Sequence, residues 1–75
     1  MKGNKIMAHK EYWVVNETAD YVEFYRSLAK AKKEAMSIHQ IGNVASIDEM
    51  DCNTVEGDIP SGQYWRIKNN QLIKL

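Results

Sequence analysis

The sequence predicts a single small α+β domain in which five strands and one helix follow the order β-β-α-β-β-β. Three observations lead to this prediction. Residues 27–40 carry the only clear helical period, short segments rich in aromatic and β-branched residues lie on both sides of it, and turn-forming residues separate those segments. With 75 residues the chain has room for one domain and a small core. We expect a mostly antiparallel sheet with the helix packed on one face.

The helix is expected to begin at Ser27 and to end near Gln40 or Ile41. Its apolar stripe is made of residues at helical spacing: Leu28, Ala31, Ala35, Ile38 and His39. Ser27 is the expected N-cap, because its hydroxyl can accept a hydrogen bond from an amide of the first turn. Gly42 is expected to take the left-handed conformation that ends many helices.

The strands are expected from their composition at 11–16, 21–25, 43–48, 63–68 and 71–75. Residues 51–62 contain two glycines and the only proline, so a loop is predicted there. Asn69 and Asn70 predict a hairpin turn, because asparagine tolerates positive φ. Residues 1–10 show no period, so a flexible N-terminal tail is expected before a domain at 11–75.

Composition narrows the class of protein. The formal net charge is zero and 44% of the residues are hydrophobic, which is typical of a folded globular protein. No apolar stretch is long enough to cross a bilayer, and the first ten residues lack the apolar region of a secretory signal. We therefore expect a cytoplasmic protein, in a bacterium or a host cell, without membrane contact. The single cysteine, Cys52, excludes a disulfide within the chain.

One helix covers only one face of such a sheet, so the other face is expected to meet water or a partner. Alternation along the strands assigns one set to the helix side: Val22, Phe24, Ala45, Ile47, Trp65 and Ile67. The open face is then expected to hold the other set: Tyr21, Tyr25, Tyr64, Arg66 and Lys68, joined by Tyr12 or Trp13. Tyrosine and arginine are enriched at the energetic centres of interfaces, so this set is the first candidate partner-binding surface.

A stretch of acidic residues is the second candidate partner-binding surface. Half of the ten acidic residues lie within eleven positions: Asp48, Glu49, Asp51, Glu56 and Asp58. An acidic loop can dock on the basic groove of an enzyme or mimic the phosphates of a nucleic acid. The alternative interpretation is a solvated acidic loop without a partner.

Basic residues gather at the start of the helix: Arg26, Lys30, Lys32 and Lys33. Together with the tyrosines of the open face, they support an alternative function, the binding of single-stranded RNA or DNA. In such a site bases stack on aromatic rings and cations meet phosphates. The zero net charge argues against this alternative. A homodimer through the open face is a third interpretation.

No motif of a catalytic or metal site is found, so neither an enzyme nor a cofactor is expected. One set of oxygen-bearing residues departs in its order from the calcium-binding EF-hand pattern: Asp48, Asp51, Asn53 and Glu56. His9 and His39 are far apart and have no cysteine or acidic partner at the spacing of a zinc motif. Cys52 has no local signature of a catalytic nucleophile and is interpreted as a spectator.

The segments EYWVV, YVEFY and SLAKAKKEA, in this order, resemble the organisation of very small phage-encoded proteins that bind and disable host enzymes. Phage inhibitors of RNA polymerase with a strand-strand-helix-strand order are one example, and some anti-CRISPR and anti-restriction proteins are similar in size and charge segregation. The resemblance covers residues 11–48 and rests on element order, and the added C-terminal hairpin departs from it. It implies a non-enzymatic module that binds and blocks a larger host protein.

Overall fold

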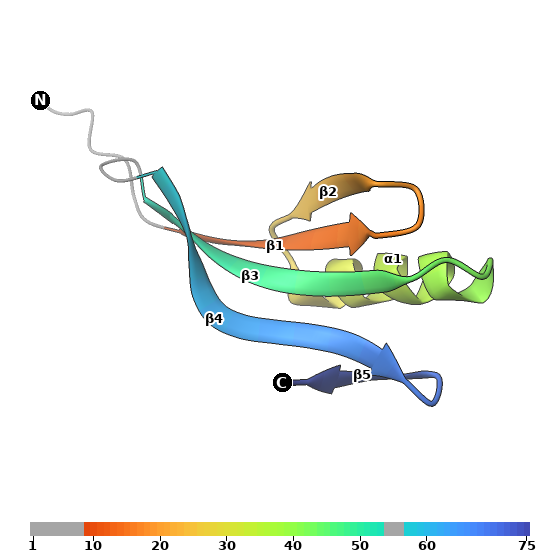
Figure 1. Cartoon of the computed structure of the whole chain (residues 1–75). Coiled ribbons are helices and arrows are strands. Elements are labelled where there is room, and N and C mark those ends of the chain that lie inside the picture. The colour runs from red at the N-terminus through yellow and green to blue at the C-terminus, as the bar shows by residue number, and fades with distance from the viewer. Residues whose placement is uncertain (1–8, 54–56) are drawn as a thin grey trace, which may run out of the picture.

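The computed structural model describes residues 9–53 and 57–75, which form a five-stranded antiparallel sheet with one helix on one face (Figure 1). The elements are β1 (His9–Asn16), β2 (Tyr21–Tyr25), α1 (Leu28–Gln40), β3 (Ala45–Asn53), β4 (Gly57–Lys68) and β5 (Gln71–Lys74). The strands lie in the order β2-β1-β3-β4-β5, and each pairs antiparallel with its neighbour. The predicted α+β class and element order are confirmed.

Helix α1 has the two caps that its sequence predicts. The Ser27 hydroxyl oxygen accepts a hydrogen bond from the Lys30 amide at 3.3 Å. At the other end, the Gly42 amide donates to the His39 carbonyl and the Asn43 amide donates to the Ile38 carbonyl. Gly42 has a φ of +93°, so this pair of bonds forms a Schellman motif that ends the helix.

The core lies between α1 and the centre of the sheet. Its buried residues come from the helix and from three strands: Val14, Ala31, Ala35, Ile38, Ala45, Ile47 and Trp65. Ala31 and Ala35 are completely buried, and their small side chains let the helix approach the sheet closely. The helix packs mainly against β1 and β3, two of the three inner strands of the sheet.

β1 begins earlier than predicted. His9 and Lys10 belong to the predicted tail of residues 1–10, but in the structure they pair with Cys52 and Asp51 of β3. This part of β1 pairs with β3 through backbone hydrogen bonds. Its side chains lack the apolar alternation by which the other strands were predicted. Residues 1–8, the rest of the predicted tail, lie outside the described residues.

The predicted loop at 51–62 is wrong, because most of it belongs to a long β3–β4 hairpin. Pairing continues from Met50–Pro60 to Asn53–Gly57 beyond a register shift at Asp48. Here β4 bends at Gly62, which has a φ of +98°. β5 pairs only with residues 65–68, so no described strand pairs with the outer edge of β4 at Pro60. A proline is tolerated on such an edge, where its missing N–H removes no ladder bond.

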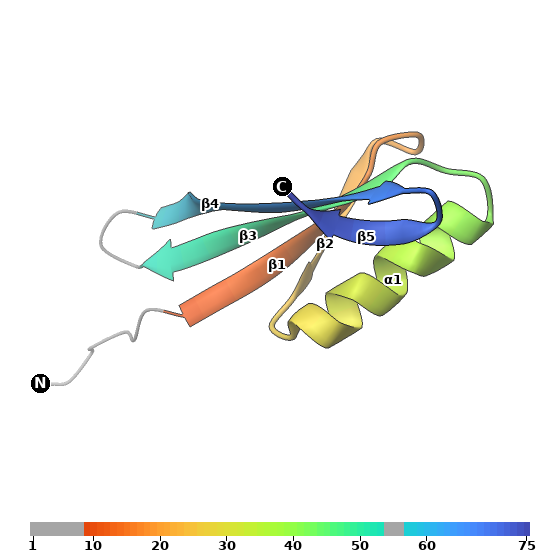
Figure 2. The ribbon, with the colours of Figure 1, turned by 90° about the horizontal axis from the view of Figure 1, so that it is seen from below.

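The far end of this hairpin projects beyond the helix. Figure 2 shows α1 under one half of the sheet, while the start of β1, the end of β3 and the start of β4 continue past it. We call these residues, 9–11, 50–53 and 57–60, the sheet extension. At the opposite end, Asn69 and Asn70 both have positive φ and form the predicted hairpin turn between β4 and β5.

Candidate functional site

The face of the sheet opposite α1 carries an exposed apolar cluster. Trp13 pairs with Phe24 and Val15 pairs with Val22, so all four side chains share this face. The Trp13 and Phe24 rings are in contact, with centroids 4.9 Å apart and planes inclined at 53°. Phe24 is 59% exposed and Val22 is 37% exposed. We call these four residues the aromatic patch.

The predicted faces of β2 are inverted in the structure. Tyr25 pairs with Tyr12, and both pack against the core on the helix side, where alternation also places Tyr21. Val22 and Phe24, predicted on the helix side, lie on the open face. The register of this edge strand with β1 sets the faces, because Tyr25 stands opposite Tyr12 and Phe24 stands opposite Trp13. The Tyr25 ring packs against the core, and its hydroxyl donates a hydrogen bond to a Glu23 carboxylate oxygen at 2.9 Å.

The predicted face of β4 is correct. Trp65 and Ile67 contact the core, so Tyr64, Arg66 and Lys68 alternate onto the open face. The Arg66 guanidinium lies 5.9 Å from the centroid of the Tyr64 ring. A guanidinium nitrogen of Arg66 also lies 3.7 Å from a carboxylate oxygen of Glu17, which follows β1. A role of these residues in partner binding stays a prediction.

Between the aromatic patch and Arg66 runs a central strip contributed by β3. Asp48 stands in register between Trp13 and Tyr64, and Ser46 stands between Val15 and Arg66. Ser46 is buried. Burial, followed by the nearby Glu17 carboxylate, raises the pKa of Asp48 above its ordinary value. The open face therefore has an apolar end and a cationic end with a partly desolvated carboxyl group between them.

The predicted acidic surface does not form as one surface, because strand alternation divides its carboxylates. Asp48 faces the open side, whereas Glu49 and Asp51 lie near Lys10, whose ammonium nitrogen is 2.6 Å from Asp51 and 3.5 Å from Glu49. Glu49 is buried and accepts a hydrogen bond from the Ser61 hydroxyl at 2.6 Å, which lowers the Glu49 pKa. Asp58 lies opposite Cys52 in β4, and Glu56 lies outside the described residues.

The same alternation rules out the calcium arrangement drawn from the sequence. Asp48 and Asp51 project from opposite faces of β3, so their carboxylates cannot share one ion. Of the other two members of that set, Glu56 lies outside the described residues, and Asn53 is placed only as the last residue of β3.

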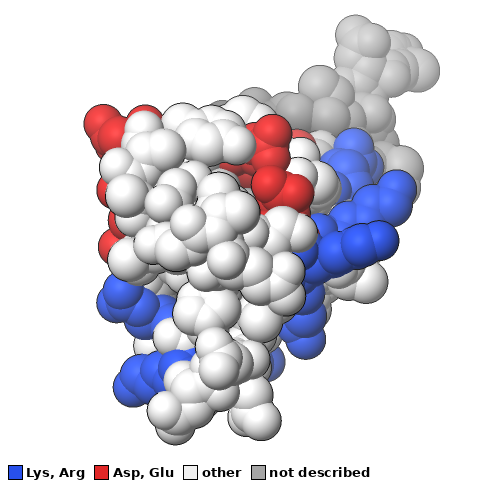
Figure 3. Space-filling view, turned by 90° about the vertical axis from the view of Figure 1, so that its right-hand side faces the viewer, with Lys and Arg blue, Asp and Glu red and all other residues white. Residues whose placement is uncertain are grey.

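The predicted basic group lies in the helix layer, away from the aromatic patch. Its members are exposed around the first turns of α1: Arg26, Lys30, Lys32 and Lys33. Two of them, Lys30 and Lys33, line a shallow hollow of about 340 Å³ together with Tyr25, Glu34 and Ser37. Figure 3 shows basic side chains on two separate flanks of the molecule, with uncharged surface between them.

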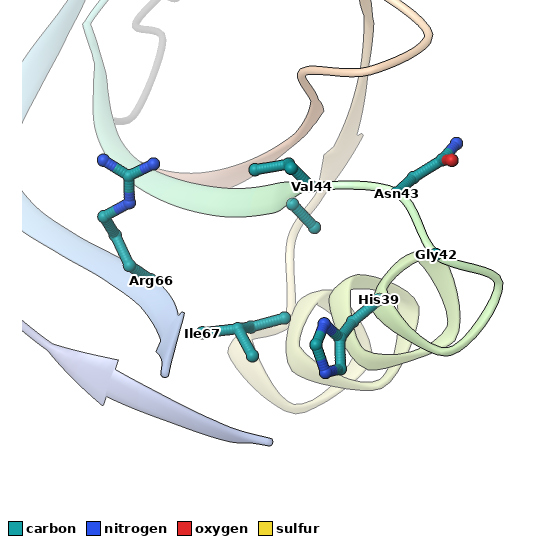
Figure 4. Close-up of a pocket in the computed structure, with 7 residues that line it drawn as sticks. His39, Gly42, Asn43, Val44, Arg66 and Ile67 are labelled. Carbon is teal, nitrogen blue, oxygen red and sulfur yellow. The ribbon is translucent and has the colours of Figure 1, made fainter. Parts of the chain in front are cut away.

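A second hollow, of about 310 Å³, lies between the end of α1 and β4. Figure 4 shows His39 on the helix side and Arg66 on the strand side of this hollow, which Val44, Ile67 and Ala45 also line. The His39 ring nitrogen Nε2 lies 2.7 Å from the amide oxygen of Asn70. The described lining holds no thiol or carboxylate, so it offers no catalytic pair.

Strand pairing gives His9 a cysteine neighbour and an acidic neighbour that the spacing of a zinc motif did not indicate. The β1–β3 register places Cys52 opposite His9, and Glu11 is two residues along the same strand. One ligand atom from each of the three side chains lies within 4.8 Å of the others. Cys52, predicted in a loop, is buried in β3, where burial and neighbouring carboxylates raise the thiol pKa to about 11. Its approach to His9 depends on strand pairing, so no sequence spacing could reveal it.

The fold and the open face define a small α+β domain with an exposed aromatic sheet surface. No family model, curated protein or solved structure matches this chain. Among the described residues, no helix has the length and apolar character required to cross a membrane.

Proposed function

We propose that this chain is a non-enzymatic interaction module that binds a larger protein through the aromatic patch. The observation that carries the proposal is the exposure of Phe24 and Val22 beside Trp13 on a sheet face that no described helix covers. Removing such apolar surface from water is favourable, at about 25 cal/mol per Å². A contiguous apolar surface of this kind on a small domain is typical of a binding site.

The remainder of the open face supports a protein partner. Aromatic residues at the centre and arginine nearby are the composition of interface hot spots. Arg66 is already held by Tyr64 and Glu17, so less side-chain freedom is lost when it meets a partner. We expect the partner to present an apolar surface to Phe24 and acidic groups to Arg66 and Lys68.

The resemblance to phage-encoded inhibitors suggests how binding would act on the partner. A domain of this size would act by covering a functional surface of a larger host enzyme. The aromatic patch would anchor the complex and Arg66 would guide its approach. The cytoplasmic location stays a prediction that belongs with this proposal.

One observation favours the alternative, binding of single-stranded nucleic acid. Tyr25 shares its hollow with Lys30 and Lys33, which places an aromatic ring beside two cations. Glu34 lines the same hollow, and Glu23 accepts a hydrogen bond from the Tyr25 hydroxyl. The negative charges of these two carboxylates would repel a nucleic-acid phosphate in the hollow. Tyr64 and the aromatic patch lie on the other side of the sheet. The set of residues predicted for nucleic acid is thus divided between two faces.

A capture experiment from bacterial lysate tests the proposal, provided that the captured protein is then purified and titrated. The wild type, Phe24→Ser and the matched control Ile41→Ser would be compared, with and without nuclease. Ile41 is 74% exposed but lies outside the aromatic patch. We expect one stoichiometric protein that survives nuclease, is retained by Ile41→Ser and is lost by Phe24→Ser.

Two outcomes would contradict the proposal. Equal affinity of the wild type and Phe24→Ser for the purified protein would show that the aromatic patch is not the binding surface. Loss of all captured material after nuclease, together with weakening by Lys30→Gln and Lys33→Gln, would favour the nucleic-acid function instead.

A further inference from the structure

Three side chains with different ligand atoms meet on the open face of the sheet extension. His9 and Glu11 are two residues apart in β1 and therefore project from the same face. Cys52 stands opposite His9 in β3. The His9 Nε2 atom is 3.1 Å from the Glu11 Oε2 atom, and an imidazole nitrogen, a carboxylate oxygen and the thiol sulfur all lie within 4.8 Å of one another.

The surroundings hold this cluster in place. The Trp13 indole nitrogen donates to Glu11 Oε1 at 3.1 Å, so the other carboxylate oxygen is directed toward His9. Cys52 is only 5% exposed, which fixes its sulfur within the sheet. Asp58 stands on the other side of Cys52, in β4, and its carboxylate interacts with the thiol. Carboxylates therefore approach the sulfur from both neighbouring strands.

We propose that His9, Glu11 and Cys52 form a binding site for a borderline divalent transition-metal ion, with Zn²⁺ as the best match. Nitrogen, oxygen and thiolate sulfur together are a donor set of zinc, whereas Ca²⁺ and Mg²⁺ prefer oxygen alone. Neighbouring ligand atoms in a tetrahedral zinc site lie roughly 3.3–3.7 Å apart, from metal–ligand distances of about 2.0–2.3 Å. Small side-chain rotations bring the three atoms from 4.8 Å or less to that separation.

The negatively charged groups around Cys52 favour the binding of a cation. Without an ion, the Glu11 and Asp58 carboxylates lie beside a buried thiol, an arrangement in which a thiolate would be repelled. A divalent cation reverses this relationship, because it replaces the thiol proton and attracts both carboxylates. The fourth position is then filled by water or by Asp58. The Trp13–Glu11 bond is an outer-shell contact of the kind that orients metal ligands.

Titration with Co²⁺, a spectroscopic substitute for Zn²⁺, tests the site in the untagged, reduced full chain. We expect one Co²⁺ per chain, a thiolate-to-cobalt charge-transfer band in the near ultraviolet, and displacement of Co²⁺ by Zn²⁺. Cys52→Ser should abolish the band. His9→Gln removes a ligand and should weaken binding by at least the roughly 10–100-fold that the loss of an outer-shell partner costs. His39→Gln, which changes the only other histidine, is the matched control and should bind like the wild type.

Cys52 is buried, so its substitution is paired with changes at the half-buried positions His9 and Glu11. Glu11→Gln and His9→Gln would be checked by circular dichroism before titration. Zn²⁺ should raise the thermal midpoint of the wild type and of His39→Gln but not that of His9→Gln. The proposal is overturned if the wild type shows no charge-transfer band. It is also overturned if His9→Gln and Glu11→Gln bind Co²⁺ as tightly as the wild type.

Discussion

The Trp13 indole N–H donates to the Glu11 carboxylate at 3.1 Å, although the two residues contribute to different surfaces. Trp13 contacts Phe24 in the aromatic patch, and Glu11 contacts His9 in the sheet extension. The two candidate sites of this domain therefore share one hydrogen bond. A change at either site should alter the fluorescence of Trp13, which contacts both.

Phe24→Ser should weaken the affinity for the protein partner by about 2 kcal/mol or more, as expected for a central aromatic residue. The free energy of unfolding should change much less, because Phe24 is 59% exposed. Calorimetric titration and urea denaturation measure the two quantities. A large loss of stability without loss of affinity would mean that Phe24 is a structural residue.

Arg66→Gln should act mainly on the rate of association. Arg66 lies at the cationic end of the open face, and exposed interface charges steer the approach of a partner more than they hold the complex. Stopped-flow or surface-based kinetics at low and high salt measure this effect. Lys74→Gln, at an exposed position of β5, is a charge-matched control. An equal slowing by both variants would attribute the effect to overall charge.

Gly42→Ala should destabilise the protein by about 1 kcal/mol, because an alanine rarely adopts the φ of +93° found there. No atom lies within 4 Å of the added Cβ, so the cost is conformational and not steric. Gly42→Asn should cost less, since asparagine tolerates this conformation better. Equal stability of the three proteins in urea would show that the Schellman motif is unimportant.

The stability of the protein should fall in acid partly through Glu49. Its pKa is held below the ordinary value of 4.5, first by the Ser61 hydrogen bond and also by Lys10. The unfolded chain therefore takes up the proton first, and the contribution of Glu49 to stability is complete above pH 4.5 and is lost as the pH falls through the folded-state pKa.

Urea denaturation from neutral to acidic pH, with Glu49→Gln as the comparison, isolates this contribution. Glu11 also has a lowered pKa, so wild-type data alone would combine two groups. The stability difference between the wild type and Glu49→Gln should shrink as the pH falls. A difference that is constant with pH would show that Glu49 has the same pKa in both states.

The sequence predicted most reliably the features that depend on nearby residues. The helix with Ser27 and Gly42 at its ends, and the Asn69–Asn70 turn, are set by residues a few positions apart. The face of β4 was also predictable, because Trp65 and Ile67 are apolar while their neighbours are polar. These signals are local, and tertiary packing did not override them.

Features that depend on the position of strands in the sheet were missed. Apolar and aromatic residues occupy both faces of β2, and its register with β1 decided that Tyr25 and not Phe24 would reach the core. The glycines and the proline of 57–62 indicated a loop, but they belong to the first part of β4, which bends and has no described partner on its outer edge. The approach of Cys52 to His9 is fixed by the β1–β3 register, which a single sequence does not reveal.

The unpaired edge of β4 has a consequence for how the protein behaves at high concentration. A bare strand edge is a template on which further chains can add, and this is a first step toward fibrils. Pro60 lacks an N–H, and the positive φ values of Gly57 and Gly62 bend the strand, so the edge is a poor template. We expect Pro60→Val to accelerate thioflavin-positive aggregation. An unchanged lag time would show that the bend alone is sufficient to keep the chains apart.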